Sequence, residues 1–242
     1  MIKVTYLDHS GFMVETPKAI LVFDYYRDPA HVLKKRLEKN RELPVVFFVS
    51  HHQGDHFNPM IFNLAQDCKR MFVLSYDIES KHVPDKGMQV AYMAPGDYIE
   101  SIADAVNVHA LRSTGAGVCY LVSTPDGKTI FHGGDLNNVP TTEKTTERDI
   151  AKEAAEMNKT AGQVAIISSK VDIAMLADDS TIGSETVANG VREFLKRIKV
   201  ANFFPMNLRG DFNKACDFVN SETETGTTFY CLDKPGAYAG ID

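Results

Sequence analysis

The chain has 242 residues, of which 44% are hydrophobic and 24% charged, as is typical of a water-soluble globular protein. Its net charge of −6 argues against a nucleic-acid partner or an acidic membrane surface, because both require a basic face on the protein. No apolar window reaches a membrane-spanning length, and residues 1–6 lack the features of a secretory signal. We therefore expect a cytoplasmic protein that acts on a small molecule. The sequence does not indicate its oligomeric state.

The four cysteines are far apart in the sequence and form no C-x-x-C pair. They are Cys68, Cys119, Cys216 and Cys231. For a cytoplasmic protein we expect buried, reduced thiols, with disulfide bonds as the alternative.

The first half of the chain predicts mainly strands. Segments of alternating or continuous apolar residues that turn residues separate are predicted as strands: 2–7, 11–16, 19–24, 44–49, 71–75, several within 88–123, and 128–132. An amphipathic helix is predicted at 30–39. The pair Asn58-Pro59 has the residue types of a helix start and predicts a helix that runs to about Lys69.

The second half of the chain predicts alternating helices and strands. Helices are predicted at 141–170, with a break near Gly162, at 184–198 and at 212–220. Strands are predicted at 171–176, 202–206 and 227–232. The whole order predicts a single α/β domain over residues 1–242, with sheets inside and helices outside.

The loop after the strand at 44–49 has an unusual concentration of metal-binding side chains. Residues 50–56 read S-H-H-Q-G-D-H, so three of the eight histidines and one carboxylate lie in six residues. Imidazole and carboxylate are the usual protein ligands of divalent metals. A metal site is therefore the leading hypothesis, and a polar surface loop is the simpler alternative.

Three more predicted strands end in polar loops, which contain Asp135, Asp179 and Asn207. Strand ends that meet at one edge of a sheet commonly form the binding sites of α/β proteins. Asp179 either lines such a site or caps the following helix. His9, in the first turn, and Arg209 can face the same edge and contact the substrate, and a solvated position is the alternative for both.

These motifs, in this order, resemble the metallo-β-lactamase superfamily. The H-x-H-x-D-H motif of that family corresponds to residues 51–56, its later G-D pair to Gly134-Asp135, and its final histidine to position 207. The turn at 8–12, D-H-S-G-F, is similar to one branch of bacterial members. The resemblance implies a four-layer αββα sandwich and hydrolysis by a metal-bound water.

The sequence departs from the family pattern at two ligand positions, because Gln53 and Asn207 stand where the family has histidines. The resemblance implies that His51 and Gln53 belong to a first ion. It assigns Asp55, His56 and Asn207 to a second ion, with Asp135 as the bridge. A further ligand that the family places between the two motifs is not identifiable. The nearest candidate, His109, lies within a predicted strand.

The exchange of histidine for an amide replaces a nitrogen donor with a neutral oxygen donor. Zinc favours nitrogen and sulfur, whereas Mn²⁺ and Mg²⁺ suit oxygen. We expect one divalent ion rather than two, with Zn, Mn or Mg as the candidates, and an empty site as the alternative. Asp55 would orient the attacking water or take its proton. The resulting hypothesis is a metal-dependent hydrolase, and the alternative is an inactive protein of the same fold with a binding or regulatory role.

Overall fold

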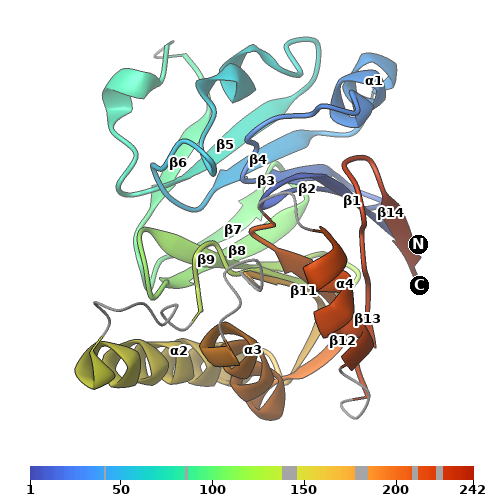
Figure 1. Cartoon of the computed structure of the whole chain (residues 1–242). Coiled ribbons are helices and arrows are strands. Elements are labelled where there is room, and N and C mark those ends of the chain that lie inside the picture. Colours follow the sequence, from blue (N-terminus) through green and yellow to red (C-terminus); the bar gives the residue numbers. More distant parts are fainter. Residues whose placement is uncertain (41, 85–86, 138–145, 178–184, 209–211, 222–225) are drawn as a thin grey trace.

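The computed structural model describes residues 1–242 except 41, 85–86, 138–145, 178–184, 209–211 and 222–225. Within these residues, two seven-stranded mixed sheets lie face to face, and helices cover the outer face of each (Figure 1). This is the four-layer α/β sandwich that the sequence predicts. Each sheet buries one face against the other sheet and its second face under helices, which explains its almost continuously apolar strands.

The first sheet joins both ends of the chain. Its strand order is β14 (Tyr238–Ile241), β1 (Ile2–Asp8), β2 (Gly11–Glu15), β3 (Ile20–Phe23), β4 (Val45–Val49), β5 (Arg70–Ser75) and β6 (Val90–Met93). Strands β3 to β6 are parallel, so their carboxyl ends lie at one edge of the sheet. Helix α1 (Val32–Lys39) and the short 3-10 helix η1 (Pro59–Asn63) pack on its outer face, and a second 3-10 turn, η2, spans Ser80–His82.

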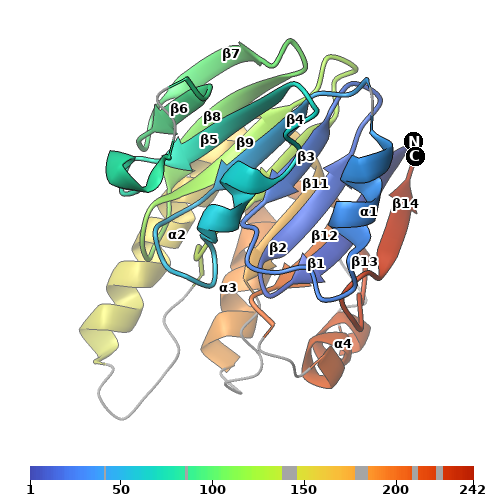
Figure 2. The ribbon, with the colours of Figure 1, turned by 90° about the horizontal axis from the view of Figure 1, so that it is seen from above.

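In the second sheet, the parallel strands β10 to β13 come from the second half of the chain. Its order is β13 (Thr228–Phe229), β12 (Lys199–Met206), β11 (Lys170–Ala177), β10 (Thr129–His132), β9 (Val118–Ser123), β8 (Val106–Arg112) and β7 (Tyr98–Ile102). Helices α2 (Glu147–Ile167), α3 (Glu185–Arg197) and α4 (Phe212–Ser221) pack against it, and α2 and α3 lie behind the strands in the view of Figure 2.

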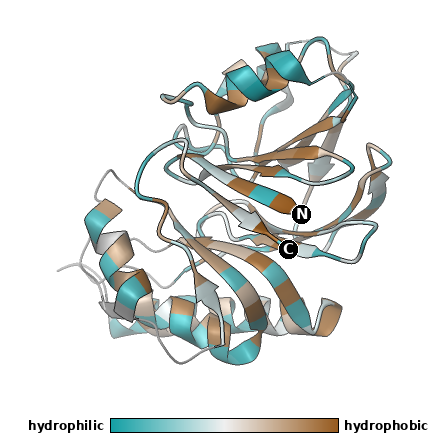
Figure 3. Cartoon of the chain, turned by 90° about the vertical axis from the view of Figure 1, so that its right-hand side faces the viewer, coloured by the Kyte–Doolittle hydropathy of each residue, from teal (hydrophilic) through white to brown (hydrophobic). Residues whose placement is uncertain are grey.

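The main core lies between the two sheets. Phe23 of the first sheet stacks on Phe48 in the neighbouring strand, with ring centroids 4.7 Å apart, and on His132 of the second sheet at 5.1 Å. The strands are brown over much of their length, whereas the helices outside them alternate teal and brown (Figure 3). Apolar burial therefore holds the layers together, and the polar residues that matter for function lie at the sheet edges.

The helix predicted from Asn58 to about Lys69 is wrong in length. The Asn58 side chain does cap a helix start, since its Oδ1 accepts a hydrogen bond from Met60 N at 3.0 Å, but the helix ends at Asn63. Arg70 Nη1 lies 2.7 Å from the carbonyl oxygens of both Phe62 and Leu64. The arginine thus satisfies carbonyls that a longer helix would use for its own hydrogen bonds.

Other differences concern the second half of the chain. Helix α2 continues through Gly162 without a break. The strand predicted at 227–232 is only two residues long, and β14, which pairs antiparallel with β1, is not predicted from the sequence. A four-residue strand that contains a glycine gives little alternating signal, and its formation depends on the β1 partner.

The expectation of reduced cysteines is wrong for one pair. Cys216 of α4 and Cys231 form a disulfide, with their Cα atoms 5.1 Å apart. Cys119 is a buried free thiol whose pKa is raised by burial, and Cys68 is a free, partly buried thiol. Of the helices in the described part of the chain, none is sufficiently long and apolar to cross a membrane.

One buried hydroxyl ties the two sheets together beside the histidine loop. Tyr120 Oη, on β9, donates to the carbonyl oxygen of Val49 at 2.9 Å, and its side chain is fully buried. We expect Tyr120→Phe to lower the free energy of unfolding by about 1–2 kcal/mol, because Val49 O loses its partner. Tyr98→Phe removes an exposed hydroxyl and is the control, with an expected change within about 0.5 kcal/mol. Equal midpoints for both variants in urea unfolding would contradict this role of Tyr120.

Candidate metal centre

The histidine loop leaves β4 and turns back sharply on itself. The amides of His56 and Phe57 both donate to the carbonyl oxygen of Gln53, at 2.9 and 2.8 Å. This turn brings the rings of His51 and His56 to within 4.0 Å of each other, and both side chains are almost completely buried. Two imidazoles from one short loop thus lie side by side at the edge of the sheets.

A fully buried carboxylate, Asp24, holds this loop in place. Its two oxygens accept hydrogen bonds from Ser50 N at 2.7 Å, Ser50 Oγ at 2.6 Å and His56 Nδ1 at 2.7 Å. Burial would raise the pKa of Asp24, but His132 and His56 outweigh it, and the pKa lies well below its usual range. Asp24 therefore stays ionised and fixes the His56 ring so that Nε2 faces the site.

Asp135, which follows β10, lies between the two histidines. Its Oδ2 is 3.3 Å from His51 Nε2, and its Oδ1 is 3.2 Å from His56 Nε2. The tight turn before it requires glycine, because Gly134 has a φ of +54° and a Cβ there would lie 2.9 Å from Ser50 Cβ. Each oxygen of Asp135 thus faces a different imidazole, which is the arrangement of a bridging carboxylate.

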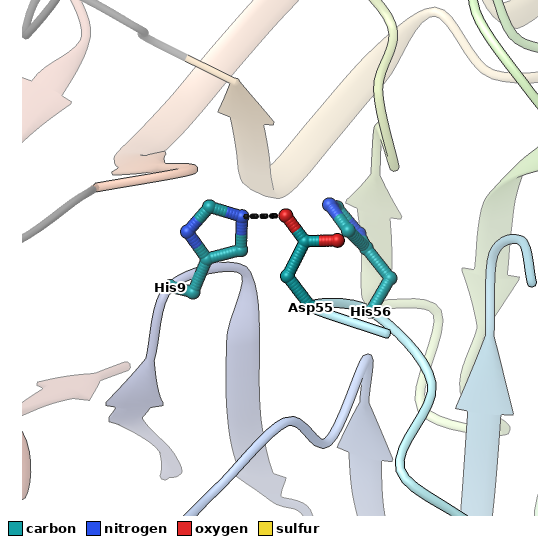
Figure 4. A group of neighbouring side chains, drawn as sticks. All are labelled: His9, Asp55 and His56. Atoms are coloured by element: carbon teal, nitrogen blue, oxygen red, sulfur yellow. Dashed lines mark ion pairs between the residues drawn. The ribbon is translucent and has the colours of Figure 1, made fainter. Parts of the chain in front are cut away.

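Two further donors complete the cluster. Gln53 Oε1 lies 3.2 Å from His51 Nε2, on the side of the first imidazole. Asp55 points to the opposite side, where its Oδ2 is 3.3 Å from Nε2 of His9 (Figure 4). His9, Asp55 and His56 each offer a ligand atom within 4.8 Å of the other two.

These spacings fit a metal ion better than they fit hydrogen bonds. Ligand atoms that surround an ion tetrahedrally at ~2.0–2.1 Å are about 3.3 Å from one another. The distances between facing donors in the cluster are 3.2–3.3 Å, whereas the bonds from Asp24 are 2.6–2.7 Å. Charge-assisted hydrogen bonds are normally about 2.7–2.9 Å long. The facing donors are therefore spaced as ligands, and the Asp24 contacts as the hydrogen bonds that orient them.

The charges around His56 hold a proton on its ring. Burial would lower its pKa, but the carboxylates of Asp135 and Asp24 outweigh burial and raise the pKa to about 10. The reciprocal effect of His56 lowers the pKa of Asp135 against its own burial. An ion bound at His56 Nε2 takes the place of that proton, so metal binding here releases protons.

The structure describes only part of the remaining predicted site. Asn207 N donates to the carbonyl oxygen of His9 at 3.1 Å, which places Asn207 beside the first turn. Its Oδ1 is buried and has no hydrogen-bond partner among the described residues. Asp179 and Arg209 lie outside the residues that the structure describes.

Three other histidines lie apart from the ligand cluster. His52 is exposed and pairs through Nδ1 with Asp77 at 2.9 Å. His109 stacks on Tyr98 at 4.2 Å, in agreement with a structural role. His132 is a packing residue, because its Nε2 contacts Ser10 O at 3.0 Å and its ring stacks on Phe23.

The loop between β8 and β9 closes the site from the second sheet. A Cβ at Gly115 would lie 3.3 Å from Asp135 Cβ, and one at Gly117 would lie 2.6 Å from His51 Cβ. Residues 113–117 read S-T-G-A-G, so this loop contains no histidine. The loop contributes shape to the centre through its glycines rather than a nitrogen ligand.

Sequence reasoning missed Asp24 as a site residue. The available signal was its position, since an aspartate directly after a buried strand is the same pattern that identified Asp135. Ser50 was likewise part of the quoted motif, but only the structure shows that its hydroxyl links Asp24 to His51 Nδ1, which lies 2.9 Å away.

Comparison with known proteins agrees with this geometry. The model of a family described as the beta-lactamase superfamily domain matches residues 3–152. A UPF0173 metal-dependent hydrolase of Thermococcus kodakarensis is 29% identical over 144 residues, which are 56% of this chain and 62% of the relative. The match thus spans about three fifths of the length of that curated relative.

Solved structures share the fold at low sequence identity. Igni18, a metallo hydrolase from Ignicoccus hospitalis, has a TM-score of 0.68 and 18% identity, with 98% of this chain and 97% of that chain covered. CmlA, a diiron beta-hydroxylase from Streptomyces venezuelae, has a TM-score of 0.62 and 12% identity, with 98% of this chain and 53% of that chain covered. Proteins of this fold therefore differ in reaction, and the fold alone does not determine it.

We expect Asp24→Asn to weaken both stability and metal binding. Asp24 accepts hydrogen bonds from Ser50 and His56, and the NH₂ group of asparagine cannot accept them. The free energy of unfolding should therefore fall by about 3 kcal/mol. Metal affinity should fall ~10–100-fold, because His56 loses its orienting partner. Asp172→Asn is the matched control, since Asp172 is also buried but bonds to Thr129 N, away from the centre. Loss of metal affinity in both variants would contradict an orienting role for Asp24.

Gly117→Ala tests whether the β8–β9 loop shapes the centre. Its φ is +64°, and a Cβ there would lie 1.9 Å from Ser50 O. Gly127 has a φ of +80° with nothing within 4 Å, so Gly127→Ala imposes comparable backbone strain without the clash. Each substitution should lower the unfolding free energy by about 1–2 kcal/mol through strain. Only Gly117→Ala should also lower metal affinity, by about tenfold or more in chelator competition, because it displaces His51.

Proposed function

Because the chain belongs to the β-lactamase superfamily, we propose that it is a hydrolase that depends on a divalent metal ion held by this centre. The observation that carries the proposal is the ligand-like spacing of His51, His56 and Asp135, with the hydrogen-bonded Asp24 behind them. The Thermococcus relative is named a metal-dependent hydrolase, which supports the proposal.

The bound ion would supply hydroxide near neutral pH, since metal coordination lowers the pKa of water to about 7. The protein contributes position and proton handling. Asp55 is the open carboxylate of the cluster, with 38% of its side chain exposed, compared with 24% for Asp135 and none for Asp24. We assign to Asp55 the orientation of the attacking water and the acceptance of its proton.

The donor set favours one ion over two. The first imidazole, His51, has the neutral Gln53 amide beside it and shares Asp135 with the second. The second imidazole, His56, has Asp55 and Asp135 close by, so two negative charges offset one bivalent ion there. We propose that the ion occupies this second set, with Asn207 Oδ1 as a further neutral oxygen donor. Zn, Mn and Mg are the candidates.

The substrate is proposed to be a small ester, amide, lactone or phosphodiester, the bonds that an activated water can cleave. Asp179 and Arg209 follow strands that end at this edge of the second sheet, and we propose that they contact the substrate. An arginine at this edge would pair with an anionic substrate group.

The test combines metal analysis with model substrates. After purification without chelators, elemental analysis should find about one divalent ion per chain, and ester or phosphodiester substrates should turn over with added Zn²⁺ or Mn²⁺. Asp55→Asn should lower kcat by ~10²–10⁴-fold, the usual contribution of a positioned acid or base. Asp104→Asn changes an exposed carboxylate that pairs with Lys69 and not with the residues of the centre, and should leave kcat unchanged. Absence of both metal uptake and turnover would contradict the hydrolase, and metal uptake without turnover would favour the binding role.

A further inference from the structure

His9 lies directly opposite the metal motif, although the two are more than forty positions apart in the sequence. It occupies the turn between β1 and β2, and its side chain is only 8% exposed. Figure 4 shows its ring facing the Asp55 carboxylate, with the His56 ring on the other side of that carboxylate. The His9 and His56 ring centroids are 5.3 Å apart.

The turn that contains His9 is anchored by the surrounding structure. Asp8 Oδ1 accepts a hydrogen bond from His9 N at 2.8 Å, and the Asp8 carboxylate is itself paired with Arg27. The carbonyl of His9 accepts from Asn207 N at 3.1 Å, and that of Ser10 lies 3.0 Å from His132 Nε2. His9 is therefore held in one position before any ligand binds, which is the condition for a strong metal ligand.

The spacing of His9 is that of a ligand and not of a strong ion pair. Its Nε2 is 3.3 Å from Asp55 Oδ2, which equals the edge of a tetrahedron with bonds of about 2.0–2.1 Å. His9, Asp55 and His56 offer atoms that all lie within 4.8 Å of one another. These three donors are two imidazole nitrogens and one carboxylate oxygen. Asp135 contacts the set through His56, whose Nε2 lies 3.2 Å from Asp135 Oδ1.

We propose that His9 Nε2 is a direct ligand of the ion held by Asp55, His56 and Asp135, and that His9 thereby supplies the imidazole that is absent at position 207. Asn207 also holds the His9 turn, because its backbone amide donates to the His9 carbonyl. The proposal rests on the metal dependence proposed above. It implies a second set with two imidazole nitrogens, which suits zinc, so the loss of a histidine at 207 does not shift the centre toward harder ions.

The test uses two histidines that share the same unusual backbone conformation. His9 has a φ of 53° and His31, which precedes α1 and is exposed, has a φ of 54°. Asparagine tolerates this left-handed conformation but is too short to take over the position of the His9 imidazole. His9→Asn and His31→Asn therefore make the same side-chain change at the same backbone conformation. Only His9→Asn alters the proposed ligand set.

Zinc affinity of the full chain is measured by competition with a chromophoric chelator, and Co²⁺ binding by its d–d absorption, which depends on the nitrogen donors. We expect His9→Asn to lower zinc affinity by at least about 100-fold, because even an outer-partner change lowers it ~10–100-fold. The Co²⁺ spectrum should change as well, and His31→Asn should match the unaltered chain in both. His9→Gly, for which this φ is unstrained, repeats the test if the asparagine variant fails to fold.

The outcomes separate this proposal from the proposed function. Unaltered zinc affinity and an unaltered Co²⁺ spectrum in a folded His9 variant overturn His9 as a ligand and leave the metal-dependent hydrolase intact. An unaltered chain that takes up neither ion overturns both. A loss of affinity in the His9 variant and not in the His31 variant supports the assignment.

Discussion

The centre depends on one buried and ionised side chain, the carboxylate of Asp24. A buried carboxylate is unfavourable unless it is hydrogen-bonded and faces positive charge. Asp24 meets this condition through the backbone and hydroxyl of Ser50 and through His56 Nδ1. These contacts join the end of β3 to the loop after β4, and the loop in turn presents His51 and His56 to Asp135. The positions of the two imidazoles on this loop follow from this interaction, because the loop has no regular secondary structure of its own to hold it.

Much of the fold follows from the sequence because its strands are buried on both faces and their apolar runs are long. The elements that differ from the sequence predictions are those whose formation or length depends on tertiary contacts. The helix after Asn58 ends early because Arg70 binds the carbonyls of Phe62 and Leu64. Strand β14 forms because β1 offers an edge, and the Cys216–Cys231 disulfide forms because α4 packs beside the chain that follows β13. Each of these contacts depends on how the folded chain brings the partners together, so no pattern of spacing reveals them.

For the candidate centre, the sequence identifies the residue types but not the role of each residue. The loop at 50–56 and Asp135 could be selected from the chemistry of their side chains, and the structure brings them together. His52 in the same loop turns outward and pairs with Asp77, which only the structure shows. Asp24 and His9 could not be ranked, because their importance comes from the side chains that they face in the folded protein, His56 and Asp55. The relation between Asn207 and His9 likewise exists only through a backbone hydrogen bond.

The donors at this centre come from places far apart along the chain, and this has a consequence for biosynthesis. His9 is synthesised almost two hundred residues before Asn207, whose backbone amide holds the His9 turn. Contacts between such distant residues form late, because loop closure over long separations is slow. The nascent chain therefore cannot assemble the full ligand set until both sheets have paired. Metal loading would then follow folding rather than guide it, and an ion that binds only the finished centre would stabilise the folded chain in proportion to the logarithm of its free concentration.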